Sequence, residues 1–114
     1  MEAMEPGKRV QVFIGERDSL DGQSLYLSIL EKLLAEGATG ATVTRGIAGF
    51  GVHRRIHTSR LAEVFPPLPL VITWVDQPAR VDALLPTICG MVGQGLVTVE
   101  EVTIAKAMHR EGAA

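Results

Sequence analysis

Cysteine and aromatic residues are both scarce in this 114-residue chain. The single cysteine, Cys89, excludes an intramolecular disulfide and a multi-thiolate zinc site within one chain. Cys89 lies in an apolar helical pattern, which predicts a small core residue. Because the chain has only one Trp, one Tyr and three Phe, the core is expected to consist mainly of Val, Leu, Ile and Ala.

An excess of positive charge is also missing. The net charge is −2 and the estimated pI is about 5.9, which counts against a dedicated nucleic-acid binder. The positive charge is instead local, because four arginines fall within sixteen residues: Arg45, Arg54, Arg55 and Arg60. This clustering favours a small anion over a polyanion as the ligand.

No hydrophobic run reaches the length of a membrane span, and the first five residues carry two glutamates, unlike a signal peptide. We therefore expect a cytoplasmic protein. With 46% apolar residues, residues 1–114 predict one globular domain with an ordered core over about residues 8–107.

The hydrophobic pattern predicts six main elements in the order βαββαβ. Periodicity and turn residues place strands at about 8–14, 40–47, 70–75 and 96–106, and helices at about 24–36 and 78–92. A short helical turn is expected at residues 60–64. This order is typical of the ferredoxin-like α+β fold, a four-stranded antiparallel sheet with two helices on one face.

Several local features refine this prediction. The apolar run at 70–75 indicates a central strand. Asp21 or Ser24 could cap the first helix, Gly37 suits its end, and Asp76 is expected to cap the second. Glu100 and its neighbour Glu101 suggest a bulge or an edge irregularity in the last strand. The bare sheet face is expected to carry Val10 and Val12 or their neighbours, and it predicts a homo-oligomer.

Residues 49–58 form the segment with the most candidate ligand-binding residues. They place Gly49, Phe50 and Gly51 before Val52 and a group of two histidines and two arginines: His53, Arg54, Arg55 and His57. Glycines let a ligand approach backbone N–H groups, and arginines bind anions through a forked set of donors. The segment is therefore either a binding loop or a solvated surface loop, and Phe50 either a core residue or a platform for a base.

Two segments resemble the PII-like signalling superfamily. One runs from Gly40 through the glycines at 49 and 51 to His57, and the other covers residues 93–102. Within that superfamily the chain is most similar to the branch called domain of unknown function 190. The segments that carry this similarity are residues 45–51, 55–58, 68–70 and 95–98, and the order of elements agrees over about residues 8–107.

The resemblance implies a homotrimer that binds adenine nucleotides in clefts between subunits. Its long loop, residues 47–68, would regulate a partner protein, such as a membrane channel or transporter. Carried over by position, the implied nucleotide contacts are Thr42 near the adenine, Gly49, Phe50, Gly51 and Val52 around the base and ribose, and Gly93 and Gly95 at the phosphate.

The chain departs from the PII pattern where phosphates bind. Leu96 stands where PII proteins have a lysine, and of two arginines on the last strand only one basic residue, Lys106, remains. The loop also contains no tyrosine for modification. These differences favour AMP or ADP, or another small anion, over ATP. Arg54, Arg55 or Arg45 would then supply the missing charge.

Other functions are compatible with the same residues. His53 and His57 have an i, i+4 spacing, but no third ligand is adjacent, so we expect no metal site. An enzyme acting on a small metabolite through the loop histidines and arginines is one alternative. A structural or metal-tolerance trimer is another. Because no carboxylate is positioned to orient a histidine, a non-enzymatic regulator without a required cofactor is the leading hypothesis.

Overall fold

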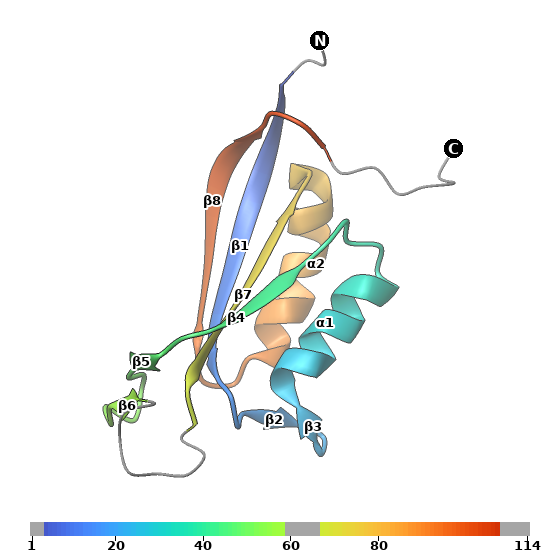
Figure 1. Ribbon diagram of the computed structural model, residues 1–114. Helices are drawn as coiled ribbons and strands as arrows, with labels where there is room; N and C mark the ends of the chain where they lie inside the picture. Colours follow the sequence, from blue (N-terminus) through green and yellow to red (C-terminus); the bar gives the residue numbers. More distant parts are fainter. Residues whose placement is uncertain (1–3, 59–66, 108–114) are drawn as a thin grey trace.

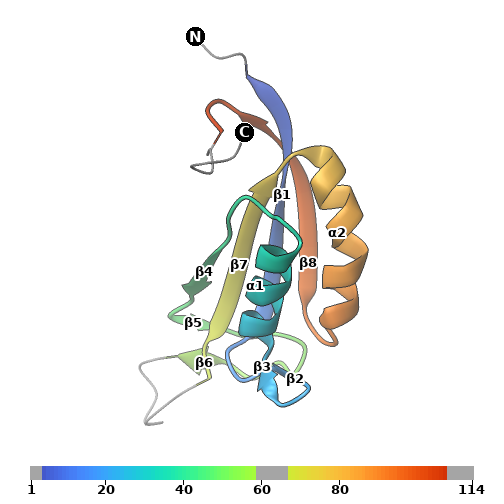
Figure 2. The same cartoon turned by 90° about the vertical axis from the view of Figure 1, so that its right-hand side faces the viewer.

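The computed structural model describes residues 4–58 and 67–107 and contains a four-stranded antiparallel sheet with two helices on one face (Figures 1 and 2). The sheet order is β4-β7-β1-β8. Its strands are β1 (Glu5–Gly15), β4 (Thr42–Arg45), β7 (Pro69–Asp76) and β8 (Leu96–Ile104), and the helices are α1 (Leu25–Ala35) and α2 (Pro78–Met91). The predicted ferredoxin-like α+β fold is therefore confirmed.

Two short strand pairs add to this frame. Strands β2 (Ser19–Leu20) and β3 (Gln23–Ser24) form a small hairpin before α1, and β5 (Ala48–Gly49) pairs with β6 (His57–Thr58) beyond the end of β4. Neither pair was predicted. The helical turn expected at 60–64 lies outside the described residues.

The core lies between the sheet and the helices. Residues opposite each other on neighbouring strands project to the same face, and the register pairs Val10 with Trp74 and Val12 with Ile72. All four side chains are buried, together with Ile29 of α1 and the inward residues Val81 and Ile88 of α2. The predicted central strand at 70–75 is confirmed, since β7 lies between β4 and β1.

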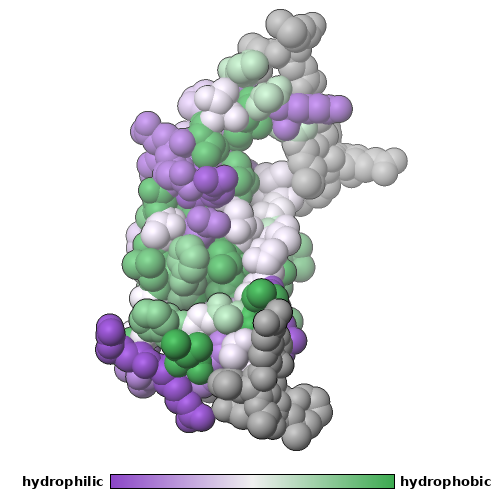
Figure 3. All heavy atoms as spheres, turned by 60° about the vertical axis from the view of Figure 1, so that its left-hand side comes forward, coloured by the Kyte–Doolittle hydropathy of each residue, from purple (hydrophilic) through white to green (hydrophobic). Residues whose placement is uncertain are grey.

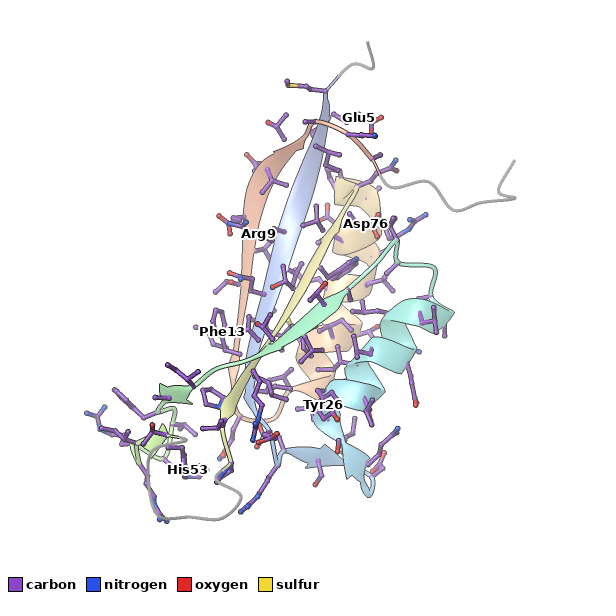
Figure 4. All side chains as sticks on the ribbon, in the orientation of Figure 1. Glu5, Arg9, Phe13, Tyr26, His53 and Asp76 are labelled. Atoms are coloured by element: carbon purple, nitrogen blue, oxygen red, sulfur yellow. The ribbon has the colours of Figure 1, made fainter. Side chains whose placement is uncertain are left out.

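In the part of the chain that the structure describes, no helix or strand covers the opposite face of the sheet. Phe13 faces Leu96 on β8 and Val71 on β7, and these residues alternate with the buried ones. Phe13 and Arg9 project from this side, whereas Asp76 and Tyr26 lie on the helix side (Figure 4). Hydrophobic atoms gather across the middle of this face (Figure 3). The open face therefore carries the sequence neighbours of Val10 and Val12, and these two valines themselves face the core.

Helix α1 ends at Ala35, and Gly37 takes the position after its C-cap residue Glu36, as predicted. The φ of +85° at Gly37 is the left-handed conformation that glycine adopts readily. The Gly37 N–H donates to the Leu34 carbonyl at 3.2 Å, and the Ala38 N–H donates to the Leu33 carbonyl at 3.0 Å. This is the Schellman arrangement, which satisfies carbonyls at the end of the helix. Ser24 occupies the N-cap position of α1, but its side chain makes no capping hydrogen bond.

Three local predictions were wrong. Cys89 is exposed, because it lies beside the buried Ile88 on the outward side of α2. The pairing of β1 with β8 continues without interruption through Glu100 and Glu101, so no bulge is present. Asp76 does not cap α2, because Gln77 is the N-cap residue. The Asp76 carboxylate instead accepts hydrogen bonds from Thr39, Trp74, Gln77 and Arg80.

Candidate functional site

The loop that follows β4 is anchored to the end of the sheet. The Gly46 N–H donates to the Pro69 carbonyl at 2.7 Å. A Cβ atom on Gly46 would lie 2.9 Å from Cγ of Pro69, and one on Gly49 would lie 3.0 Å from the same atom. Both glycines therefore let the loop pass close to the proline. Pairing of Ala48 with Thr58 then closes residues 50–56 into a projecting loop.

Glu16 anchors the returning side of the same loop. Its backbone N–H donates to the Leu68 carbonyl at 3.0 Å, and its Oε1 accepts from the Leu68 N–H at 3.3 Å. Nε of Arg45 lies 2.9 Å from Oε2 of Glu16. The hydrogen bond from Arg45 is the main cause that lowers the pKa of Glu16. Strands β1 and β4 and the segment before β7 are thus joined at one point.

A cavity of about 480 Å³ lies between this anchored base and the projecting loop, at the end of the molecule that carries β5 and β6 (Figure 1). Ligand sites commonly have volumes of roughly 300–1,000 Å³. Six of the ten nucleotide-binding residues suggested by the sequence line it: Gly49, Phe50, Gly51, Val52, Arg55 and Gly95. The structure therefore brings the loop motif and the second glycine turn to one space.

The other four suggested residues do not line this cavity. Thr42 is exposed on β4, opposite Thr73, and Gly93 is exposed in the turn before β8. Lys106 lies two residues beyond the far end of β8. At roughly 3.3 Å per residue, that end is about 26 Å from Leu96. Within one chain, Lys106 and the glycine turn cannot reach the same ligand.

Arg54 also has a different environment from Arg55. Its guanidinium carbon lies 5.7 Å from the centre of the Phe50 ring, within the range of a cation–π contact. The backbone of Arg54 has a φ of +56° at the end of a turn in which its N–H donates to the Gly51 carbonyl at 2.9 Å. Phe50 is thus not a core residue. Its ring is exposed, and the guanidinium group of Arg54 lies over it.

The two glycines of the turn before β8 have different roles. A Cβ on Gly95 would lie 2.6 Å from the Phe13 carbonyl oxygen and 2.9 Å from Cγ1 of Val92, so only glycine packs there. A Cβ on Gly93 would meet nothing within 4 Å. Gly95 is therefore explained by packing within the chain, whereas nothing in the described residues explains Gly93.

The cavity wall carries more positive than negative groups. Among the described lining residues, two arginines, Arg17 and Arg55, stand against a single carboxylate, that of Asp18, and the imidazoles of His53 and His57 add further polar groups. Oδ2 of this carboxylate accepts the Gly15 N–H at 2.9 Å. Sequence analysis missed Arg17, which lies in a polar turn without a distinctive pattern. The described residues contain no group of three or more potential metal ligands.

His57 contributes an unsatisfied polar atom to this region. Its Nδ1 is buried and has no hydrogen-bond partner among the described residues. A buried polar atom without a partner is unusual and costs stability. Among the residues that the structure describes, no carboxylate bonds to Nδ1 in the way that an orienting acid bonds to a histidine base.

The fold is shared with solved structures of another protein. The fold matches that of CPII, a nitrogen regulatory PII-like protein from Thiomonas intermedia K12, in a structure bound to ADP, AMP and bicarbonate. The TM-score is 0.68 at 16% sequence identity, over 91% of this chain and 92% of that chain. The apo form of the same protein matches with a TM-score of 0.55, also at 16% identity, over 90% of this chain and 95% of that chain. The molecule therefore has a PII-like fold.

The chain belongs to the DUF190 family, which is described as an uncharacterized ACR and whose model matches residues 7–104. It is 33% identical to a UPF0166 protein of Aquifex aeolicus over 97 residues, which are 85% of this chain and 91% of that protein. It is 29% identical to a UPF0166 protein of Methanocaldococcus jannaschii over 104 residues, 90% of this chain and 95% of that protein. Among the described residues, no helix is long and apolar enough to cross a membrane.

Proposed function

We propose that this chain is a non-enzymatic, PII-like regulatory protein that binds AMP or ADP. The cavity between the sheet end and the loop carries this proposal, because six residues suggested by sequence meet there. CPII, with the same fold, is bound to ADP and AMP in its structure. The cavity is lined by backbone, by Phe50 and by cationic side chains, which suit a base and an anionic phosphate.

The binding form is a homotrimer in which a neighbouring subunit completes the cavity. The open sheet face supports this, since Phe13, Val75 and Leu96 are 37%, 38% and 57% exposed on it. Three apolar side chains on one uncovered face favour association with another copy. Three of the suggested residues do not meet within one chain: Thr42, Gly93 and Lys106. In the trimer, different subunits around a shared cleft would supply them to the ligand.

Regulation would act through the 47–68 loop on a membrane channel or transporter. Its described part exposes Ile47 and Ile56, which do not line the cavity, at 79% and 62%. Large exposed apolar side chains on a charged loop are typical of a surface that contacts another protein. A ligand that contacts the inner side of the loop would change the surface that this partner sees.

Calorimetric titration with AMP, ADP, ATP and adenosine tests the nucleotide claim. AMP or ADP should bind more tightly than ATP. Arg55→Ala should weaken AMP binding more than Arg54→Ala, because only Arg55 lines the cavity. Absence of heat and of thermal stabilisation with all four ligands would remove the nucleotide from the proposal.

Light scattering after gel filtration tests the trimer. Leu96→Glu places a charge on the open face and should give monomers. Leu34→Glu is the matched control, because Leu34 is 79% exposed on α1, on the helix side of the sheet. A wild-type monomer, or a trimer that persists in Leu96→Glu and dissociates in Leu34→Glu, would contradict this assembly.

A further inference from the structure

The turn that follows β1 holds a cationic residue at the cavity from a rigid position. The Asp18 N–H donates to the Gly15 carbonyl at 3.2 Å, and the Gly15 N–H donates to Oδ2 of Asp18 at 2.9 Å. The Asp18 carbonyl in turn accepts the Leu25 N–H, at the start of α1, at 2.8 Å. Residues on both sides of Arg17 are therefore fixed to the main fold, and its backbone is fixed with them.

The neighbouring acid, Glu16, has Arg45 as its main cationic partner. Glu16 is held by Arg45, with Nε and Oε2 2.9 Å apart, and by the Leu68 N–H. The hydrogen bond from Arg45 is the largest cause of the lowered pKa of Glu16, and the charge of Arg17 is the smallest. Arg45 is thus the counter-ion of Glu16, and the Glu16 carboxylate does not line the cavity that Arg17 lines.

Arg17 and Arg55 reach the same cavity from segments that are far apart in sequence. One comes from the turn at the end of β1 and the other from the loop between β5 and β6. Arginine side chains carry planar forks of donors that match the oxygens of a phosphate, and two arginines line this one cavity. The only carboxylate among the described lining residues, Asp18, already accepts the Gly15 N–H.

We propose that Arg17 is a phosphate-binding residue of the nucleotide site, acting from the rigid end of the sheet while Arg55 acts from the loop. The proposal rests on the nucleotide function proposed above and names the cation for it. Position 96 is a leucine where the resemblance to PII proteins would place a phosphate-binding lysine. Arg17 supplies positive charge to the same cavity, which Gly95 also lines. The phosphate of AMP or ADP is the group that Arg17 recognises.

The test compares AMP with adenosine, which shares the base and ribose but has no phosphate. Calorimetry on the full chain should show that Arg17→Gln weakens AMP binding about tenfold or more, as expected for loss of a hydrogen bond to a charged group. Adenosine binding should change less than twofold. Arg17→Lys should lie between, because it keeps the charge and loses the fork. Lys32→Gln, in an exposed pair with Glu36 on α1, is the control and should match wild type.

Two results would overturn the role of Arg17. One is AMP binding by Arg17→Gln within twofold of wild type, and the other is an equal loss for AMP and adenosine, which would indicate a change of shape. Thermal melts check folding, and Arg17→Lys keeps the test decisive if Arg17→Gln is unstable.

An inorganic phosphate arm separates this inference from the proposed function. If wild type binds no nucleotide but phosphate raises its melting temperature, and Arg17→Gln abolishes that rise, the anion role stands and the nucleotide function fails. If neither nucleotides nor phosphate have any effect on wild type, both fail.

Discussion

Replacing Asp76 by Asn should be strongly destabilising, because this carboxylate joins three parts of the fold. Asp76 is 4% exposed. Its Oδ2 accepts the Thr39 N–H at 3.0 Å and the Trp74 indole N–H at 3.1 Å. Its Oδ1 accepts the Thr39 hydroxyl at 3.1 Å, the Gln77 N–H at 3.0 Å and Arg80 at 3.2 Å. The segment after α1, the end of β7 and the start of α2 therefore meet at one side chain.

The size of the effect follows from the donors. An asparagine has only one acceptor oxygen, and its NH₂ group is a donor. Whichever way the amide is turned, the NH₂ group therefore faces at least two N–H groups whose hydrogen bonds it cannot accept. Each orphaned buried donor costs about 1–3 kcal/mol, which gives a loss of about 3 kcal/mol in the free energy of unfolding. For a domain of this size, that is a fall of roughly 10 °C in Tm.

The dependence on pH has a definite sign. Burial alone would raise the pKa of Asp76, but the donors from Thr39, Trp74 and Gln77 and the charge of Arg80 together hold it below its ordinary value of 3.8. A carboxyl with a depressed pKa in the folded state stabilises above its unfolded pKa and loses that contribution as the pH falls through the folded pKa. The difference between wild type and Asp76→Asn should thus be constant from about pH 5 to 8 and shrink below about pH 4.

Urea unfolding at several pH values measures both quantities. Asp82→Asn is the control, because its exposed carboxylate pairs with Lys8 at 2.7 Å and should contribute less than about 1 kcal/mol. A loss of under about 1 kcal/mol for Asp76→Asn at pH 7, or an equal loss for Asp82→Asn, would refute the reasoning.

Three further changes test the region around the cavity. Gly95→Ala should lower the free energy of unfolding in urea by about 2 kcal/mol, since its Cβ would collide with a backbone oxygen. Gly93→Ala should stay within about 0.5 kcal/mol of wild type. Equal effects would contradict the difference in packing between the two glycines. Glu16→Gln should speed amide hydrogen exchange at Leu68 without changing exchange in the core, and uniform exchange rates would show that Glu16 does not anchor the loop. His57→Phe should be neutral or stabilising by up to about 1 kcal/mol, because it removes a buried nitrogen that has no partner among the described residues. A clear loss of stability would show that Nδ1 has a partner.

The fold was predictable because its signals are local. Alternation at residues 8–14, helical spacing after Ser24 and a glycine at 37 each determine an element through neighbours in sequence. The errors arose where contacts between residues far apart in the sequence determine the local structure. Asp76 resembles a helix cap in sequence, yet Thr39, 37 positions earlier, supplies two of its donors. Two-residue strands such as β5 and β6 are too short to show any alternation.

The residues that line the candidate site were predictable only near its glycines. Glycine-rich segments at 49–51 and 93–95 drew attention to the loop and to the turn before β8, and the structure brings both ends to one cavity through Gly51 and Gly95. Arg17 could not be found in this way. Its position depends on contacts of Asp18 with Gly15 and Leu25, and such contacts leave no pattern around the arginine itself.

Residues of the loop have different surroundings, which under the proposed function would allow the loop to couple a ligand to a partner. Phe50 and Val52 line the cavity, whereas Ile47 and Ile56 do not and remain largely exposed. Phe50 also carries Arg54 on its ring. A nucleotide base that takes a place against Phe50 would displace this arginine and move charge onto the outer surface. Under the proposed function, the ligand would therefore change the surface offered to a partner while the anchored base at Glu16 stays in place.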